Sequence, residues 1–512
     1  MAHKKNRGRD TQPPRETELK LECPPDAVGG IPALPVLAEA EPVPEAGGTL
    51  TATYFDTPER ALREAGLSVR LRRNGERTIQ TVKAETGSRG LILDRREWEV
   101  AVDGNELDWK AAAKTALKPF LAEGRERIQP AFTVEAERAA LAVRRDGALI
   151  ELVADDVRIS AGDGELRFGE VELEVKKGDA KGVFGLALDL ADAAPVRLSL
   201  LTKSERGYAL LSKEPPSPVK AERLALPADA TAAEAFQIVA RSCLSQTIRN
   251  EALIRSTRNP LALHQTRVGL RRLRAAASLF KDLIADEEST RIRAELRWMN
   301  HALGPVRDLD VLVARMRAAP EAERERGHAK ALAAAERRRT EAYDHVLELL
   351  NGARFRKAVI ATAAWIEGGR WLTSDAPGLR RIRDERVVDR AVGELARRRK
   401  KVLKRAKALA EMDPHARHQV RIEIKKLRYG AEFFGSLFAG DKAKKRRRES
   451  LDTLEALQEV LGELNDIAVG GHILAPPPAQ DGEVPADAQV QALLGRARDL
   501  TRALARTKPF WE

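Results

Sequence analysis

Residues 16–22 read Glu-Thr-Glu-Leu-Lys-Leu-Glu and alternate charged with uncharged side chains at the period of a β-strand. In a strand every second side chain lies on the same face, so Glu16, Glu18 and Lys20 share one face and the leucines take the other. Two carboxylates and an ammonium on one face could bind a divalent metal ion and contact an anionic substrate. A single strand of this kind is more often an ordinary amphipathic strand with its charged face in water, so the pattern gains meaning only from matching strands downstream.

The same type of segment recurs seven more times before residue 177. These segments are residues 51–57, 67–73, 78–84, 91–100, 132–143, 148–159 and 165–176. Most of their connections are short, which favours mostly antiparallel pairing and an eight-stranded barrel with a charged lumen. A sandwich stays open as an alternative, because apolar residues such as Val69, Leu71 and Leu173 would suit a packed core between two sheets. Helical stretches are expected at 58–64 and 107–123.

After a proline-rich break at 213–228 the chain changes character. From residue 231 onward it is rich in Ala, Leu, Arg and Glu at helical spacing, with almost no strand signal. An Ala-Pro-Pro-Pro run at 475–478 is expected to form a loop before a final helix at 487–506. The predicted organisation is a disordered basic tail at 1–14, an α+β antiparallel barrel domain at 15–212, a linker at 213–228 and an all-α helical bundle at 229–510.

The helical part contains an internal two-fold repeat. His264-Gln-Thr-Arg267-Val-Gly-Leu-Arg271-Arg272-Leu-Arg274 matches His418-Gln-Val-Arg421-Ile-Glu-Ile-Lys425-Lys426-Leu-Arg428, and Leu303-Gly304 to Arg307-Asp308 matches Leu461-Gly462 to Asn465-Asp466. At about 100° per residue, the histidine and basic residues of each copy fall in one arc of a helix, beside an apolar face. We therefore expect two copies of one helical unit, whose basic arcs line a groove.

The net charge of +12 suggests polyanionic partners such as nucleic acid, polyphosphate or an anionic membrane surface. Only 4% of the residues are aromatic, which argues against stacking on the bases of single-stranded nucleic acid. Cys23 and Cys243 are far apart and in no metal-binding spacing, which fits a reducing compartment. The charged N-terminus lacks the apolar core of a secretory signal, and no apolar run approaches the ~20 residues that span a bilayer, so we expect a cytoplasmic protein.

Several motifs of the first half follow one another in an order that is typical of a known family. Glu16-x-Glu18-x-Lys20, Tyr54-Phe55-Asp56-Thr57, Arg70-Leu71-Arg72 and Glu170-Val171-Glu172, closed by Thr202-Lys203-Ser204-Glu205-Arg206-Gly207-Tyr208, resemble the CYTH or triphosphate tunnel metalloenzyme family. The resemblance covers about residues 15–212. It implies an eight-stranded antiparallel barrel that forms a tunnel, with metal-dependent hydrolysis of triphosphates or, in some members, cyclisation of ATP.

This resemblance implies roles for the charged residues of the strands. A triphosphate needs cations from several directions, and the expected phosphate-binding residues are Arg70, Arg72, Lys83, Arg138 and Lys203. Carboxylates suit Mg²⁺ or Mn²⁺, and the expected metal ligands are Glu16, Glu18, Asp155, Glu170 and Glu172. The expected catalytic set is Glu16, Glu18 and Lys20. Two interpretations stay open for five further charged residues, which could form ion pairs inside the tunnel or plain pairs on the surface: Arg95, Glu97, Glu99, Glu151 and Glu174.

The repeated motifs of the second half resemble the CHAD family, which is all-helical and binds inorganic polyphosphate. The resemblance covers about residues 229–510. It implies polyphosphate contacts from His264, Arg267, Arg271, Arg274, Arg307, His418, Arg421, Lys425 and Arg428. Asn465 stands where the first copy has Arg307, so the second copy should bind more weakly. Each copy has a single motif histidine, which favours hydrogen bonding to phosphate or to a neighbouring residue over a metal site.

Together these features predict a divalent-metal-dependent inorganic triphosphatase with a polyphosphate-binding helical domain. The expected partners are inorganic triphosphate or polyphosphate, with no membrane and no specific nucleic-acid binding, and association with polyphosphate granules is compatible with this. Thiamine triphosphatase and ATP cyclase stay open as alternatives, because their phosphate-binding residues would be the same. A non-catalytic polyphosphate-binding adaptor is a third possibility, against which the intact acidic set weighs.

Overall fold

Antiparallel strands dominate the first part of the computed structural model, which describes residues 15–85, 90–91, 93–122, 124–179, 181–212, 215–320, 327–473 and 486–512. The predicted tail at 1–14 and the predicted loop at 475–478 lie outside these residues. The chain forms two compact units. The first holds the residues up to 220 with 244–267 and 298–368, and the second holds 221–243, 268–297 and 369–512. The predicted domain boundaries are not tested by this division and stay a prediction.

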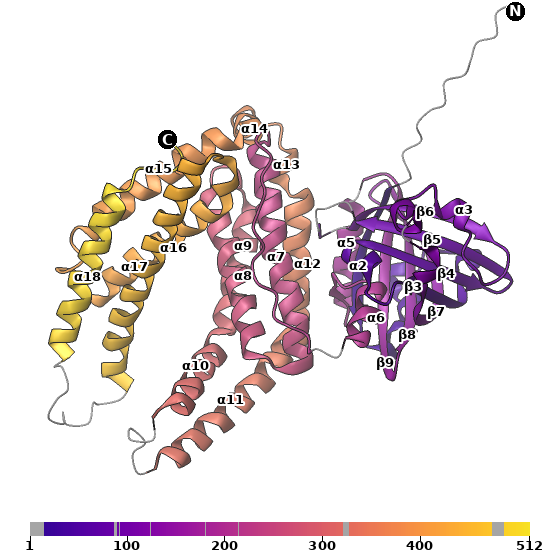
Figure 1. Ribbon diagram of the computed structural model, residues 1–512, viewed down its shortest axis with the longest axis horizontal. Coiled ribbons are helices and arrows are strands. Elements are labelled where there is room, and N and C mark those ends of the chain that lie inside the picture. The colour runs from indigo at the N-terminus through magenta and orange to yellow at the C-terminus, as the bar shows by residue number, and fades with distance from the viewer. Residues whose placement is uncertain are drawn as a thin grey trace, which may run out of the picture. The chain divides into compact units, whose positions relative to one another are not determined.

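All eight predicted strands are present. They are β1 (Arg15–Cys23), β3 (Gly48–Asp56), β4 (Leu67–Asn74), β5 (Arg77–Glu85), β6 (Leu93–Val102), β7 (Gln129–Arg145), β8 (Ala148–Ala161) and β9 (Gly164–Lys177). The described residues also form two short strands, β2 (Glu41–Pro42) and β10 (Arg197–Leu198). Figure 1 shows these strands together in one curved sheet.

The strand order runs β1-β6-β5-β4-β3-β7-β8-β9 and returns to β1, with every pair antiparallel. The return is shared along β1, because Arg15 to Glu18 pair with β6 and Glu18 to Cys23 pair with β9. The sheet is therefore not closed along its full height. The barrel class predicted from the alternation is nevertheless confirmed, and the sandwich alternative is not observed.

One end of the enclosed face is apolar. Phe132, Val134 and Ala136 of β7 join a buried cluster with residues of β3, β8 and β9 and with Tyr208 of helix α6 (Lys203–Leu211). The Tyr208 hydroxyl donates a hydrogen bond to the buried Asp56 at 2.6 Å. Further along the same inward faces, the side chains become charged. The fold thus encloses a charged space that is filled with apolar side chains at one end.

The outer face of β4 and β5 is covered by short helices. Val69, Leu71 and Val82 pack in a second buried cluster with side chains of α2 (Ala61–Glu64) and α3 (Trp109–Ala112). The prediction of one helical stretch at 107–123 is wrong, because the segment forms α3 and then α4 (Lys118–Ala122). The Thr115 hydroxyl donates to the carbonyl of Ala112 and accepts from the amide of Leu117, and this turn separates the two helices.

The remaining short elements of the first part lie beside the sheet or in its connections. They are α1 (Pro25–Val28), α5 (Lys181–Ala193) and the 3₁₀ turns η1 (Ile31–Ala33), η2 (Pro35–Leu37), η3 (Pro44–Ala46) and η4 (Arg125–Arg127). Helix α5 packs on the outside of β8, where a Cβ on Gly182 would approach Ile150.

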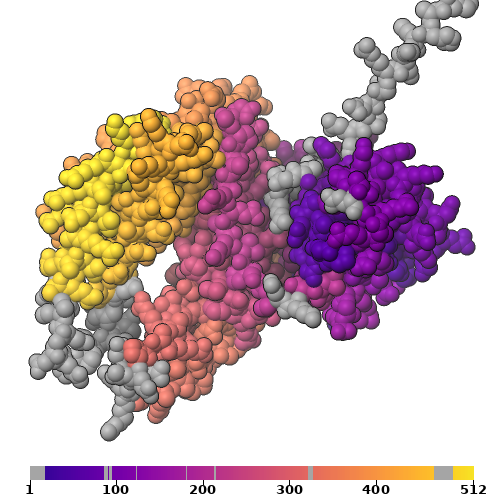
Figure 2. All heavy atoms as spheres, viewed as in Figure 1, coloured from indigo at the N-terminus to yellow at the C-terminus, as the bar shows by residue number. Residues whose placement is uncertain are grey.

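The rest of the described chain is helical, as predicted. Its helices are α7 (Ala232–Thr257), α8 (Pro260–Leu279), α9 (Glu287–Ala302), α10 (Gly304–Ala318), α11 (His328–Asn351), α12 (Ala353–Gly368), α13 (Arg370–Thr373), α14 (Pro377–Asp384), α15 (Val387–Ala406), α16 (Pro414–Phe434), η6 (Gly435–Leu437), α17 (Asp441–Ile473) and α18 (Ala486–Arg506). Helices α10 and α11 pack side by side (Figures 1 and 2). Within the described residues, no helix combines the length and apolarity needed to cross a bilayer.

The internal repeat is visible as a recurring contact. In the first unit, Arg267 donates to the carbonyl of Asn300 and lies over Gly304. In the second unit, Arg421 donates to the carbonyl of Gln458 at 3.4 Å and lies over Gly462. Each glycine follows its carbonyl partner by four residues, and a Cβ there would crowd the guanidinium. The leading arginine of each copy therefore fixes a neighbouring helix.

Candidate active site

A cavity of about 660 Å³ lies within the barrel and is lined mainly by charged side chains. Its basic lining residues are Lys20, Arg70, Arg72, Arg77, Lys83, Arg95, Arg138, Lys176 and Lys203. Its acidic lining residues are Glu18, Glu45, Glu97, Glu99, Glu151, Glu172 and Glu174. The five residues whose role was left open all line it, so they form ion pairs of the tunnel rather than of the outer surface.

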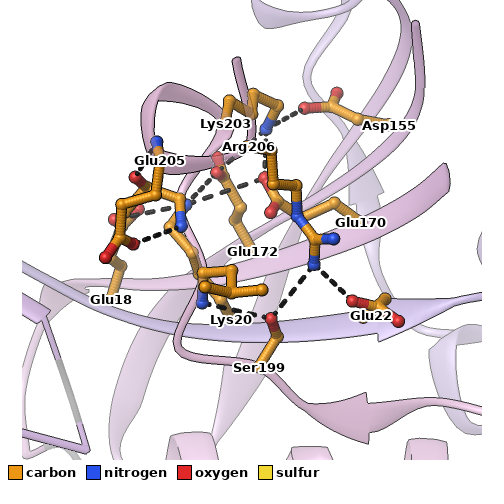
Figure 3. Close-up of polar contacts among 12 residues, drawn as sticks. Glu18, Lys20, Glu22, Asp155, Glu170, Glu172, Ser199, Lys203, Glu205 and Arg206 are labelled. Atoms are coloured by element: carbon orange, nitrogen blue, oxygen red, sulfur yellow. Dashed lines mark hydrogen bonds and ion pairs between the residues drawn. The ribbon is translucent and has the colours of Figure 1, made fainter. Parts of the chain in front are cut away.

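Two lysines meet the acidic residues of β1, β8 and β9 in what we call the acid–lysine cluster: Glu18, Lys20, Asp155, Glu170, Glu172 and Lys203 (Figure 3). The Nζ of Lys20 lies 3.3 Å from Glu18 and 3.7 Å from Glu170, and it contacts Glu172 more closely. The Nζ of Lys203 lies 3.0 Å from Asp155 and 3.1 Å from Glu172, and it contacts Glu170 more closely. The pairing of β1 with β9 brings Lys20 opposite Glu172.

Burial and mutual charge set the protonation of this cluster. Burial would raise the pKa of Glu172, but Lys20, Lys203 and Arg138 hold it well below its usual range. Burial also raises the pKa of Glu170, and here the two lysines do not offset it fully. For both lysines burial opposes the charged form, yet the surrounding carboxylates raise the pKa of each. Of Asp155, Glu170 and Glu172, Glu170 is thus the carboxylate that takes up a proton most readily.

Arg138 holds Asp155 from the neighbouring strand. Its Nε and Nη2 donate to the two carboxylate oxygens, each at 2.7 Å, which is the bidentate geometry expected of a strong ion pair. Asp155 is fully buried and does not line the cavity, and neither does Glu170. Of the five expected metal ligands, Glu18 and Glu172 face the cavity, whereas Asp155 and Glu170 lie behind its wall. The side chain of Glu16 lies outside what the structure describes.

The donor set suits a divalent metal ion. One carboxylate oxygen each from Asp155, Glu170 and Glu172 can be chosen so that all three lie within 4.8 Å of one another. Oxygen ligands of this kind are what Mg²⁺ and Mn²⁺ prefer. The Oε2 of Glu170 is buried and has no hydrogen-bond partner among the described residues, so it is available as a ligand.

The acids of the cluster are already matched one to one by cations. Besides the two lysines, Arg138 pairs with Asp155 and Arg95 pairs with Glu18. A divalent ion would add two positive charges to a balanced group. We infer that a metal ion enters this site most favourably together with an anionic ligand, or by displacing an ammonium group.

The cavity is also lined by arginines that repel one another. Arg70 and Arg72 of β4 line the cavity, whereas Arg73 is exposed and does not. Arg70 lowers the pKa of Arg72 to about 10, with burial adding to the effect. The Nη1 of Arg70 donates to the Tyr54 hydroxyl at 3.4 Å, while its buried Nε has no hydrogen-bond partner among the described residues. Such a wall is suited to an anion.

Sequence reasoning missed several lining residues. Tyr54 was noted within a motif but given no role, although nearby cations, Arg70 foremost, outweigh its burial and lower its pKa. Arg77 and Lys176 line the cavity as well. Period-two alternation does place Lys176 on the charged face with Glu172, although it was given no role there, and it could have found Arg77, which shares a strand face with Lys83. Lys83 itself lies 3.1 Å from Glu97.

The second unit contains a separate basic cluster, consisting of Arg271 and Arg274 of α8, Arg293 and Arg297 of α9, and Lys425 of α16. Burial, Arg421 and Arg271 lower the pKa of Lys425 to about 8, so residues of the two predicted basic arcs lie close together. Burial and the other three arginines also lower the pKa of Arg274. The sequence reasoning missed Arg293 and Arg297, which lie outside the repeated motif.

The remaining residues of the two predicted basic arcs have different surroundings. His264, Arg267 and Arg307 belong to the first unit and are half-buried. In the second unit His418 is exposed, and Arg428 lies 3.4 Å from Glu432 and 3.8 Å from Glu455. The charge of Arg428 is therefore partly matched, whereas its counterpart Arg274 is surrounded by arginines.

Comparisons with known proteins agree with both halves of this description. Residues 14–208 match the family model of the CYTH domain, and residues 238–475 match that of the CHAD domain. An inorganic triphosphatase of Haemophilus influenzae is 27% identical over 200 residues. That match covers 39% of this chain and 56% of the relative, so the chain spans about half the relative's length.

Two solved structures each resemble part of the chain. The CHAD domain of the plant Ricinus communis is 27% identical with a TM-score of 0.46, covering 57% of this chain and 98% of that one. A putative adenylyl cyclase from Hippeastrum with a dominant triphosphatase activity is 18% identical with a TM-score of 0.29, covering 38% of this chain and 95% of that one.

Proposed function

The chain carries a CYTH domain followed by a CHAD domain, and on this premise we propose that its barrel hydrolyses inorganic triphosphate or short polyphosphate with a divalent metal ion. The observation that carries the proposal is one cavity that is lined both by carboxylates and lysines of the acid–lysine cluster and by the neighbouring Arg70 and Arg72, of which Arg70 lowers the pKa of Arg72. A triphosphate fits this combination, since its phosphates need cations while a metal ion needs carboxylates.

The residues have distinct tasks in the proposed reaction. Arg70 and Arg72 hold the phosphate chain, and binding of an anion relieves their mutual repulsion. Lys20 and Lys203 face the phosphate that is cleaved and stabilise its developing charge. Glu18 and Glu172, with the carboxylates behind them, would hold Mg²⁺ or Mn²⁺, which would neutralise charge and lower the pKa of a bound water molecule. In-line attack then depends mainly on positioning and electrostatic stabilisation.

The lining favours an inorganic substrate over a nucleotide. Among the described lining residues, Tyr54 is the one aromatic side chain, and its hydroxyl is already engaged by Arg70. Organic ligands usually bind in pockets with mainly apolar and aromatic walls, which this cavity lacks. Thiamine triphosphate and ATP are therefore the less favoured substrates.

The face of β4 offers a matched test with the full chain. Arg72→Ala should lower kcat/KM for inorganic triphosphate by about 10- to 100-fold, because a charged contact to phosphate is lost. Arg73→Ala, one residue away on the exposed face, should leave the constants within about twofold of wild type. Phosphate release in steady-state assays measures both. A larger loss in Arg73→Ala would reject the assignment of this strand face.

We further propose that the helical region binds long-chain inorganic polyphosphate at the basic cluster of the second unit. Among the described residues, Arg271, Arg274, Arg293 and Arg297 have no acidic partner within ion-pair distance. Burial and the neighbouring arginines lower the pKa of Arg274 and of Lys425. A linear polyanion would meet several of these charges at once, so binding should be multivalent and salt-dependent.

Lys425 makes this second proposal testable by pH. Its pKa of about 8 means that it loses its charge as pH rises through 8, and a bound polyanion would hold it protonated. Affinity should therefore be steady below about pH 7 and fall about tenfold by pH 9.5. The Lys425→Arg variant keeps its charge and should lose this dependence. The affinities are measured by fluorescence titration of labelled polyphosphate into full-length Glu18→Gln protein, with and without Lys425→Arg, and with a DNA duplex for comparison. Equal pH dependence with and without Lys425→Arg would contradict the assignment of Lys425 to the binding site.

A further inference from the structure

Strand β1 and helix α6 each carry a lysine of the acid–lysine cluster, and each continues into a second ion-pair network. Glu22 follows Lys20 by two residues on β1, and Arg206 follows Lys203 by three on α6. Arg206 donates to Glu22 and, at 3.4 Å, to the Ser199 hydroxyl (Figure 3). The two elements that present the catalytic lysines are thus joined to each other through Glu22 and Arg206.

Helix α7 joins this network from a distant part of the sequence. The Nη2 of Arg255 donates to the second oxygen of Glu22 at 3.0 Å, while its Nε donates to Glu251 at 2.8 Å. Glu251 also accepts from Arg197 of β10 at 3.2 Å. Burial would raise the pKa of Glu22, but Arg206 and Arg255 together lower it. Glu22 therefore holds its charge between one arginine of α6 and one of α7.

A second arginine of α7 holds the start of α6. The Nη1 of Arg249 lies 3.3 Å from Glu205, and its Nη2 donates to the carbonyl of Leu200 at 3.5 Å. Glu205 closes a capping box with Thr202, the residue that precedes Lys203. Arg249 consequently contacts both the segment that enters α6 and the first turn from which Lys203 extends.

The centre of the network is buried and its other charged side chains are half-buried, and all of its residues belong to the first compact unit. Glu251 and Arg197 are 7% and 8% exposed, and the amide of Ser199 donates to the carbonyl of Lys20 at 2.9 Å. Removing one partner from such a network leaves the others with unmatched buried charge, so the elements that carry them should shift. The elements that would shift are those that place Lys20 and Lys203.

We propose that Arg249 and Arg255 are positioning residues for the acid–lysine cluster. They hold α6 and β1 so that both lysines meet the carboxylates of β8 and β9. Both arginines lie within the residues that match the CHAD model, whereas the cluster lies within those that match the CYTH model. The helical region thus completes the scaffold of the barrel's site. The expected loss of rate rests on the proposed triphosphatase function, whereas the expected shift of α6 and β1 does not.

The kinetic test uses full-length variants. Arg255→Ala and Arg249→Ala should each lower kcat for inorganic triphosphate about tenfold or more, with a smaller change in KM, because misplaced catalytic groups cost rate before they cost binding. Arg255→Lys keeps the charge and should recover part of the loss. The control is Lys357→Ala, which removes an exposed ion pair between α12 and Asp192 of α5 and should leave kcat within about twofold.

Hydrogen exchange separates this inference from the proposed function. The amides of residues 203–208 should exchange at least about tenfold faster in Arg249→Ala and Arg255→Ala than in wild type or Lys357→Ala, while those of α18 should not change. If wild type is inactive on triphosphate, the proposed function fails and exchange alone decides the positioning role. The positioning role would be overturned if Arg249→Ala and Arg255→Ala left exchange in α6 unchanged, or if, in an active enzyme, their kcat equalled that of Lys357→Ala.

Discussion

Replacing Glu18 with glutamine is expected to lower kcat for inorganic triphosphate by at least about 100-fold, comparable to the loss of one principal electrostatic contact. Glu18 is 3% exposed, lines the cavity and contacts both Lys20 and Arg95. Glutamine keeps the shape but removes the charge that a metal ion would meet, and it leaves both cations less well matched. Phosphate release at saturating triphosphate, over a series of metal concentrations, gives the measurement.

Glu165→Gln provides the control for this experiment. Glu165 lies near the start of the strand that carries Glu170 and Glu172, but it is exposed and pairs at 3.6 Å with the exposed Arg158. Its loss should change kcat by less than about twofold. Near-normal turnover in Glu18→Gln, with Glu165→Gln also normal, would reject Glu18 as part of the site.

Replacing Lys203 with methionine should cost about 3–5 kcal/mol of folding stability, because it leaves buried carboxylates without their cation. Lys203 is 8% exposed and lies within ion-pair distance of Asp155, Glu170 and Glu172. Chemical denaturation at pH 7 measures the loss. Exposed Lys357→Met, which breaks a surface pair, should cost less than about 1 kcal/mol.

The pH dependence of this loss has a defined sign. In the wild type the pKa values of Asp155 and Glu172 are lowered, so the stability they contribute is present above their unfolded values and lost as pH falls through and below 4. In Lys203→Met the same carboxylates should protonate more readily, which relieves their repulsion. The stability difference between the two proteins should therefore narrow from pH 7 towards pH 4. A difference that stays constant would show that Lys203 stabilises by packing and not by charge.

Alternation along single strands predicted the barrel and part of its site. The face of β4 that carries Arg70 and Arg72 lines the cavity, as period two requires, and each of the eight predicted segments forms a strand. The predicted helix at 107–123 failed because a side-chain-capped turn at Thr115 divides it. At this position the hydrogen bonds of one hydroxyl group favour a turn more strongly than the helical spacing of the residues favours a continuous helix.

The depth of each side chain could not be read from the sequence. Asp155 and Glu172 look equivalent in their strands, yet Asp155 lies behind the wall of the cavity while Glu172 faces it, because strand register decides their neighbours. The contact of Arg255 with Glu22 joins residues 233 positions apart. No periodicity carries such information, since it arises from packing of separate elements.

The most direct test of the central claim is phosphate release from inorganic triphosphate by the full-length wild-type protein, with Mg²⁺ or Mn²⁺ and again after chelation. Thiamine triphosphate and ATP serve as comparison substrates. We expect metal-dependent release that is fastest on inorganic triphosphate and stops on chelation. No release from inorganic triphosphate with either metal, or release that a chelator leaves unchanged, would contradict it.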